Sequence, residues 1–174
     1  MKIGTVGALS ANKGQLQVIK AVAKLECKLS ITYSCAGLTD KDYLKSLIIH
    51  SQILEVKFEH LGTLSPENLR IFYNSLDVLI MPSSSEGFGL VAVESIACGT
   101  PVIVPSHLPI VKESGLLNER NTIIINDNST NEICKGILEF MSRNFSKIDV
   151  SESINFITWK QVANKYLDLY NEIS

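Results

Sequence analysis

Short apolar runs alternate with longer amphipathic stretches along this chain, and no other feature of the sequence restricts the fold so strongly. This alternation is typical of parallel strands joined by helices. We expect strands at residues Lys2–Leu9, Leu29–Ala36, Val56–His60, Val78–Pro82, Pro101–Val104 and Thr122–Ile125. Six such strands predict an α/β fold, a single Rossmann-like domain with a doubly wound, mostly parallel six-stranded sheet.

The amphipathic stretches between the runs predict the helices that cover such a sheet. We expect helices at Lys13–Leu25, through Tyr43–Ile48, from Ser65 through Tyr73, and at Gly89–Cys98, Thr130–Arg143 and Trp159–Glu172. Ser65 is a good N-cap, and Pro66 suits the first helical position because its missing N–H costs nothing there. No linker, repeat or low-complexity tract interrupts the order, so we predict one domain over residues 1–174.

The composition indicates a folded protein without affinity for nucleic acid. The 174 residues are 45% hydrophobic and 20% charged, with a net charge of -2 and no long basic block. Electrostatic binding to nucleic acid or to an anionic membrane is therefore not expected. The four widely spaced cysteines lack the spacing of a metal site and predict free thiols in a reducing compartment. Because no signal peptide follows Met1, we expect a cytoplasmic protein.

Ligands of a doubly wound sheet bind beyond the carboxyl ends of its strands, so the loops that follow strands matter most. We expect these loops at residues 9–13, 37–40, 61–65, 83–89 and 105–109. The last of them holds His107, with Glu113 nearby. A lone histidine in a loop is more often simply solvated, and we assign it no role.

The fourth loop carries the strongest chemical signal. Glu86, Gly87, Phe88, Gly89 and Leu90 lead into a helix that also contains Glu94, which we expect about two turns into the helix and on the same face as Gly87. The glycines let the backbone approach a ligand, and the first turn of the helix offers unpaired amides to a phosphate. Both carboxylates can accept hydrogen bonds from sugar hydroxyls, which predicts one cleft for a nucleotide-sugar. The alternative is that both glutamates are solvated and merely favour a helix start by their charge.

A second glycine-containing turn, from Gly7 to Gly14, follows the first strand. Lys13 at the start of the next helix could neutralise a diphosphate there. The turn matches neither the P-loop nor the dinucleotide-binding glycine pattern, so a surface lysine is an equally open interpretation. The sheet topology nevertheless predicts that Lys13 lies on the same rim as Glu86 and Glu94.

These segments resemble the large retaining glycosyltransferase group called family 4 or group 1. The resemblance is carried by Val6–Leu9 with Lys13–Gly14, by Pro82–Leu90, and by Glu94–Ile103, in which Glu86 and Glu94 are similar to the E-x7-E motif of the family. The resemblance covers nearly the whole chain, and its segments follow one another in the order of the family. It implies the C-terminal, donor-binding half of a two-domain GT-B enzyme that acts in polysaccharide biosynthesis.

The resemblance also implies a role for each matching residue. Glu86 would be catalytic and contact the donor sugar, Glu94 the nucleotide ribose, Lys13 and the Gly7 turn the diphosphate, and the backbone around Gly87, Phe88, Gly89 and Leu90 the phosphate. It implies transfer of a hexose with retention, from a nucleotide-sugar to a saccharide or lipid-linked acceptor, without a cofactor or metal. The acceptor-binding half of the family is absent from these residues, and it would act in cis or in trans. That half could also bring the enzyme close to a membrane.

Ala8 stands where the family usually has arginine, and a lysine does not replace a bidentate guanidinium. This departure and the missing half favour the first of three alternatives to a transferase that stay open. The chain could be a non-catalytic donor-binding subunit that needs a separate acceptor-binding partner and is inactive or weakly active alone. It could also be an epimerase of related architecture, or a structural remnant.

Overall fold

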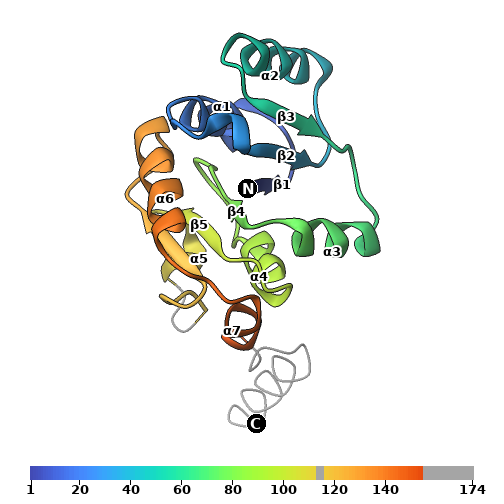
Figure 1. The fold of residues 1–174 in the computed structure, drawn as a ribbon. Coiled ribbons are helices and arrows are strands. Elements are labelled where there is room, and N and C mark those ends of the chain that lie inside the picture. The colour runs from blue at the N-terminus through green and yellow to red at the C-terminus, as the bar shows by residue number, and fades with distance from the viewer. Residues whose placement is uncertain (113–115, 155–174) are drawn as a thin grey trace.

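The chain folds around a six-stranded parallel sheet with the strand order β3-β2-β1-β4-β5-β6 (Figure 1). This computed structural model describes residues 1–112 and 116–154. The strands are β1 (Lys2–Val6), β2 (Thr32–Ala36), β3 (Lys57–His60), β4 (Val78–Ile80), β5 (Val102–Pro105) and β6 (Thr122–Ile125). The predicted doubly wound α/β fold is confirmed.

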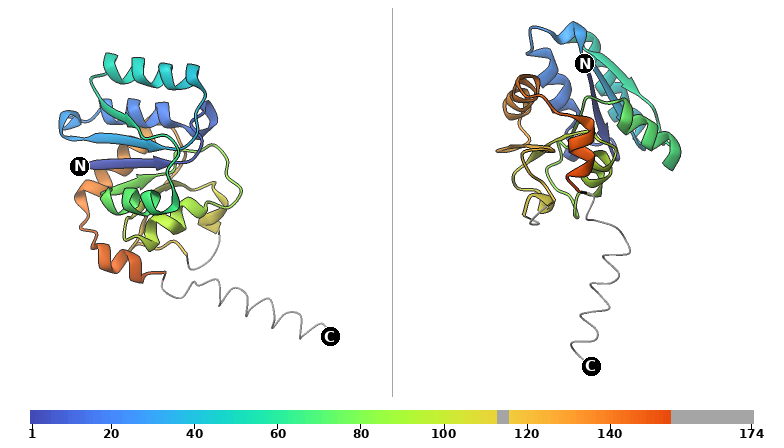
Figure 2. Two further views of the ribbon diagram at one scale, coloured as in Figure 1. Left: turned by 90° about the vertical axis from the view of Figure 1, so that its right-hand side faces the viewer. Right: turned by 60° about the horizontal axis from the view of Figure 1, so that its bottom comes forward.

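Helices cover both faces of the sheet (Figure 2). They are α1 (Gln15–Ala23), α2 (Lys41–Ile53), α3 (Pro66–Ser75), α4 (Leu90–Ala97), α5 (Pro109–Lys112), α6 (Thr130–Ser142) and α7 (Lys147–Glu152), with short 3-10 turns at Ala11–Lys13 and Lys28–Ser30. One buried cluster packs α1, α2 and α6 on the sheet, and the other packs α3, α4, α5 and α7. The two clusters share the strands because side chains alternate between the faces of a sheet.

The structure corrects several predicted boundaries. The first strand ends at Val6 rather than Leu9, although Leu9 still forms an isolated bridge to Thr39. The second begins at Thr32, because the residues before it form the 3-10 turn. Helices α5 and α7 were not predicted, and residues 105–109 therefore end in a helix. The expected helix Trp159–Glu172 and Glu113 lie outside the described residues.

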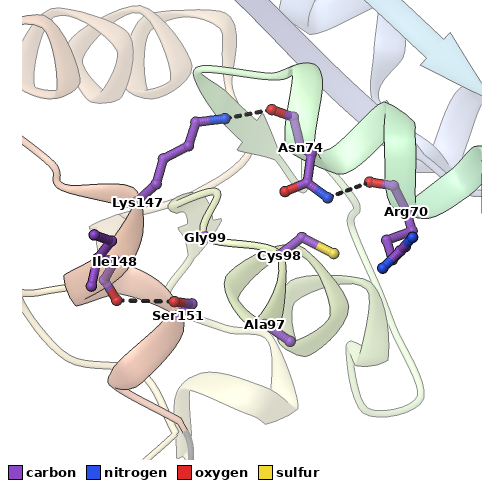
Figure 3. A pocket seen from close by; sticks show the side chains of 8 residues that line it. All are labelled: Arg70, Asn74, Ala97, Cys98, Gly99, Lys147, Ile148 and Ser151. Atoms are coloured by element: carbon purple, nitrogen blue, oxygen red, sulfur yellow. Dashed lines mark hydrogen bonds between the residues drawn. The ribbon is translucent and has the colours of Figure 1, made fainter.

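A shallow hollow of about 400 Å³ lies between α3, the end of α4 and α7 (Figure 3). Lys147 of α7 crosses this region and donates to the carbonyls of Asn74 and Leu76, at the end of α3. A lysine beside the last carbonyls of a helix is favoured by the helix dipole. Lys147 therefore fastens α7 to α3. The hollow lies toward the amino ends of the strands, away from the start of α4.

Candidate functional site

The strand order reverses between β1 and β4, which pair directly at the centre of the sheet. From β1 the chain proceeds outward through β2 and β3, and from β4 it proceeds the other way through β5 and β6. The loops after β1 and β4 therefore diverge at the carboxyl edge and leave a crevice between them. These loops are residues 7–14 and 81–89, the two segments in which the sequence analysis found chemical signals.

The two loops are joined by backbone contacts. The Ser84 amide and hydroxyl both donate to the carbonyl oxygen of Asn12, at 2.9 and 3.0 Å. Gly14 has a φ of 73°, and a Cβ atom there would lie 2.1 Å from the Pro82 carbonyl oxygen. Only glycine permits this approach, because any side chain would collide with backbone that cannot move aside. The close approach brings Lys13 to the β4–α4 loop.

Lys13 and Glu86 meet across the crevice. The distance from Lys13 Nζ to Glu86 Oε1 is 2.7 Å, and the Ser83 hydroxyl donates to the same oxygen at 2.6 Å. Both charged side chains are about a quarter exposed, at 26% and 23%. Glu86 Oε2 has no hydrogen-bond donor among the described residues. The expected proximity of Lys13 and Glu86 is therefore observed, whereas their roles toward a ligand stay predictions.

Helix α4 begins at Leu90, one residue after Gly89, which is buried and has a φ of 109°. The Ala92 amide donates to the Gly89 carbonyl at 2.9 Å and closes the first turn. The amides of Phe88, Gly89 and Leu90, at the start of the helix, donate to no acceptor in the described part of the chain. They are suited to an anion at the helix start, as predicted for a phosphate.

Glu94 lies just over one turn into α4, rather than the two turns expected. Gly87 precedes the helix, so the helical period does not place it on the same face as Glu94. The Glu94 side chain is exposed, and its Oε2 accepts a hydrogen bond of 2.8 Å from the Tyr73 hydroxyl on α3. Glu86 and Glu94 thus have partners on different elements. That they border one cleft around a ligand stays a prediction.

Burial and the neighbouring Glu94 carboxylate both raise the pKa of Tyr73 well above its usual value. The phenol therefore keeps its proton over the neutral range and acts as a hydrogen-bond donor to Glu94. The sequence analysis did not find this partner. The two residues are 21 positions apart, and the sequence analysis placed Tyr73 only within its helix.

Two further side chains donate hydrogen bonds to the β4–α4 loop, and the sequence analysis predicted neither contact. His107 donates from Nε2 to the Ser84 carbonyl at 3.1 Å, and Asn128 donates from Nδ2 to the Pro82 carbonyl at 3.1 Å. His107 was expected to be solvated, and it is exposed but in contact with the loop. Each residue stands alone in its own loop, so no spacing pattern could have indicated these contacts.

The first loop exposes Ala8 at the rim, with its carbonyl fixed by Gln15 Nε2 at 3.1 Å. Gly7 and Gly87 have open space where a side chain would lie. The cysteines predicted to be thiols are free, and burial raises the pKa of Cys35 to about 12. Over residues 1–112 and 116–154, no helix has the length and apolar character needed to cross a bilayer.

Comparison with known proteins identifies the family of this chain. Residues 1–153 match the family described as Glycosyl transferases group 1. The chain belongs to this family. The resemblance inferred from the E-x7-E segment is thereby confirmed at the level of the family.

The curated glycosyltransferases that resemble this chain are longer proteins. An uncharacterized glycosyltransferase of Methanocaldococcus jannaschii is 30% identical over 177 residues, which cover 95% of the chain and 43% of that protein. A D-inositol 3-phosphate glycosyltransferase of Arthrobacter sp. is 39% identical over 104 residues, which cover 56% and 24%. The chain spans less than half the length of these relatives.

Solved structures confirm the fold. The sucrose-phosphate synthase of Thermosynechococcus elongatus aligns with a TM-score of 0.82 and 20% identity, over 99% of this chain and 45% of that one. The C-terminal domain of a group 1 glycosyl transferase of Francisella tularensis aligns with a TM-score of 0.72 and 22% identity, over 95% and 85%. Anabaena HepE, solved in complex with UDP, aligns with a TM-score of 0.74 and 22% identity, over 87% and 42%.

Proposed function

We propose that this chain is the donor-binding half of a glycosyltransferase that moves a hexose from a nucleotide-sugar to a saccharide or lipid-linked acceptor. The observation that carries the proposal is the Lys13–Glu86 pair across the crevice, beside the unused amides at the start of α4. A cation and a row of amides suit a diphosphate, and a carboxylate beside them suits the hydroxyls of the attached sugar.

In the proposed donor site, each part of this geometry has a role. Lys13 and the amides of Phe88 and Gly89 would stabilise the negative charge that develops on the departing diphosphate, which is the step that oriented donors accelerate. Glu86 has one oxygen engaged by Lys13 and Ser83, so its second oxygen is available to a sugar hydroxyl. Glu94 would accept from the ribose hydroxyls.

Retention of anomeric configuration and independence from metal and cofactor belong to the proposal through the family resemblance. Four free thiols are compatible with the cytoplasmic location that we propose. The acceptor would bind to a second half, in cis or in trans, that faces the crevice. Polysaccharide assembly is the process that we propose for the complete enzyme.

The test has two stages. First, the melting temperature of the chain is measured with UDP-, GDP- and ADP-sugars, because a ligand that binds only the folded state raises it. Second, the dissociation constant of the stabilising donor is measured by calorimetry for the Glu94→Ala variant. We expect affinity to fall about 10- to 100-fold, as for the loss of charge-assisted hydrogen bonds. No stabilisation by any donor, or unchanged affinity in the variant, would contradict the proposal.

A non-catalytic donor-binding subunit is the second candidate. The exposed Ala8 favours it, because the rim lacks the guanidinium that is usual in the family. Such a subunit would bind a nucleotide-sugar and transfer nothing until a separate acceptor-binding partner is added. Transfer of sugar by the chain alone to any saccharide acceptor would eliminate this candidate.

A further inference from the structure

Tyr73 connects the hydrophobic core to the exposed carboxylate of Glu94. Tyr73 as a whole is 2% exposed and packs in the cluster under α3 and α4. Its backbone is fixed as well, because the buried Thr100 hydroxyl donates to the Tyr73 carbonyl at 2.7 Å. The Ser95 hydroxyl of α4 in turn donates to the Thr100 carbonyl at 3.0 Å. Tyr73 is therefore rigidly placed relative to the helix that carries Glu94.

The hydroxyl of this fixed ring determines where one carboxylate oxygen lies. It donates to Glu94 Oε2 at 2.8 Å, and Glu94 Oε1 accepts no hydrogen bond within the described residues. An exposed glutamate without such a partner samples several rotamers and loses that freedom when it binds a ligand. The bond to Tyr73 removes most of this freedom beforehand and leaves Oε1 available.

We propose that Tyr73 is a positioning residue that holds Glu94 so that its second oxygen accepts from the adjacent hydroxyls of a nucleotide ribose. This inference rests on the proposed function, since it assigns Glu94 to the ribose. The competing explanation is purely structural: a buried tyrosine needs an acceptor for its hydroxyl, and Glu94 supplies one. The two explanations differ in what the loss of the hydroxyl does to a ligand.

The experiment removes only the hydroxyl, through Tyr73→Phe, and keeps the buried ring. Affinity is measured for whichever of UDP, GDP and ADP stabilises the chain most, and for its 2′,3′-dideoxy counterpart. We expect the ribonucleotide to bind about 3- to 10-fold more weakly, which matches the cost of ordering one side chain. The dideoxy nucleotide should bind unchanged, so the discrimination between the two ligands falls.

Tyr33→Phe is the matched control. Tyr33 is a buried tyrosine whose hydroxyl donates to Thr5 Oγ1 at 3.0 Å, because Thr5 itself donates to the Ile80 carbonyl. Its loss should lower the melting temperature and leave discrimination between the two nucleotides intact. A structural role for Tyr73 would produce the same behaviour as this control.

A double-mutant cycle with Glu94→Ala separates the remaining outcomes. The inference requires that Tyr73→Phe changes the affinity only when Glu94 is present. If Glu94→Ala weakens ribonucleotide binding and Tyr73→Phe does not, the positioning role is wrong and the proposed function stands. Equal loss from Tyr73→Phe in both backgrounds also overturns it. If Glu94→Ala has no effect, the assignment of Glu94 to the ribose fails, and this inference fails with it.

Discussion

Lys13 is paired with Glu86, so a diphosphate bound as we propose would have to share or replace that contact. The pair is partly exposed, and such ion pairs contribute at most about 1 kcal/mol to stability. The pairing is therefore easily exchanged. Its larger effect is to hold the ammonium group of Lys13 at the crevice.

Lys13→Gln should weaken binding of a nucleoside diphosphate about 5- to 30-fold, the range for losing one charged hydrogen bond at a partly exposed site. Binding of the corresponding nucleoside, which lacks phosphate, should be unchanged. Calorimetry with both ligands measures the two effects. Lys20→Gln, an exposed lysine of α1, is the control and should alter neither. Equal losses for nucleoside and diphosphate would show that Lys13 does not contact the phosphates.

At Ala8 the opposite test is possible, in which a positive charge is added to the rim rather than removed. The side chain of Ala8 is exposed, so an arginine can be accommodated there. Ala8→Arg should tighten diphosphate binding about 3- to 10-fold, because a guanidinium can donate two hydrogen bonds to a phosphate. The gain should shrink as the salt concentration rises. Gln52→Arg on α2 adds the same charge far from the rim and should change little. An unchanged affinity for Ala8→Arg would mean that the loop does not face the phosphates.

The proximity of Lys13 and Glu86 could be predicted from the sequence, because each follows a strand and the strand order brings those loops together. The contact between Tyr73 and Glu94 could not, since it depends on the relative placement of α3 and α4. The same holds for His107 and Asn128, whose loops meet residues 82–84 only after the sheet has formed. Local patterns thus locate loops, whereas the partners of a side chain follow from packing.

At the scale of elements, the sequence predicted correctly a helix with a strong local start signal, but it missed the short helices α5 and α7. Ser65 caps α3 as predicted and accepts from the Asn68 amide at 3.3 Å. By contrast, α7 has only 6 residues and is held by packing and by Lys147. A helix of that length has little intrinsic stability, so periodicity cannot reveal it.

The start of α4 depends on a conformation that favours glycine. Gly89 has a φ of 109°, and a Cβ atom there would lie 3.1 Å from Ile110 Cγ2. Gly89→Ala should therefore lower the free energy of unfolding by about 1 to 3 kcal/mol, the cost of a strained backbone with a side chain. Denaturant unfolding measures it.

Gly87→Ala is the control for this helix start. Gly87 has open space around it and no positive φ, so the substitution should change stability by less than about 0.5 kcal/mol. Similar losses for the two variants would mean that the loop, rather than the conformation of Gly89, limits stability.

At the scale of the whole molecule, the crevice separates two halves of one sheet. Lys13 follows β1, which leads to β2 and β3, and Glu86 follows β4, which leads to β5 and β6. A ligand that contacts both loops therefore connects the two halves directly. At a concentration 100 times its dissociation constant it should add about 2.7 kcal/mol to the free energy of unfolding.

Hydrogen exchange can show where that stabilisation acts. With saturating nucleoside diphosphate, we expect amides in residues 7–14 and 83–92 to become more protected together, because both loops contact one ligand. Amides of α2, at the outer edge of the sheet beside β3, should gain protection only where exchange requires unfolding of the whole domain. Lys13→Gln should reduce the protection of both loops and not of one alone. If protection is confined to a single loop, the ligand does not bridge the crevice, and the donor site must be sought on that side of the sheet only.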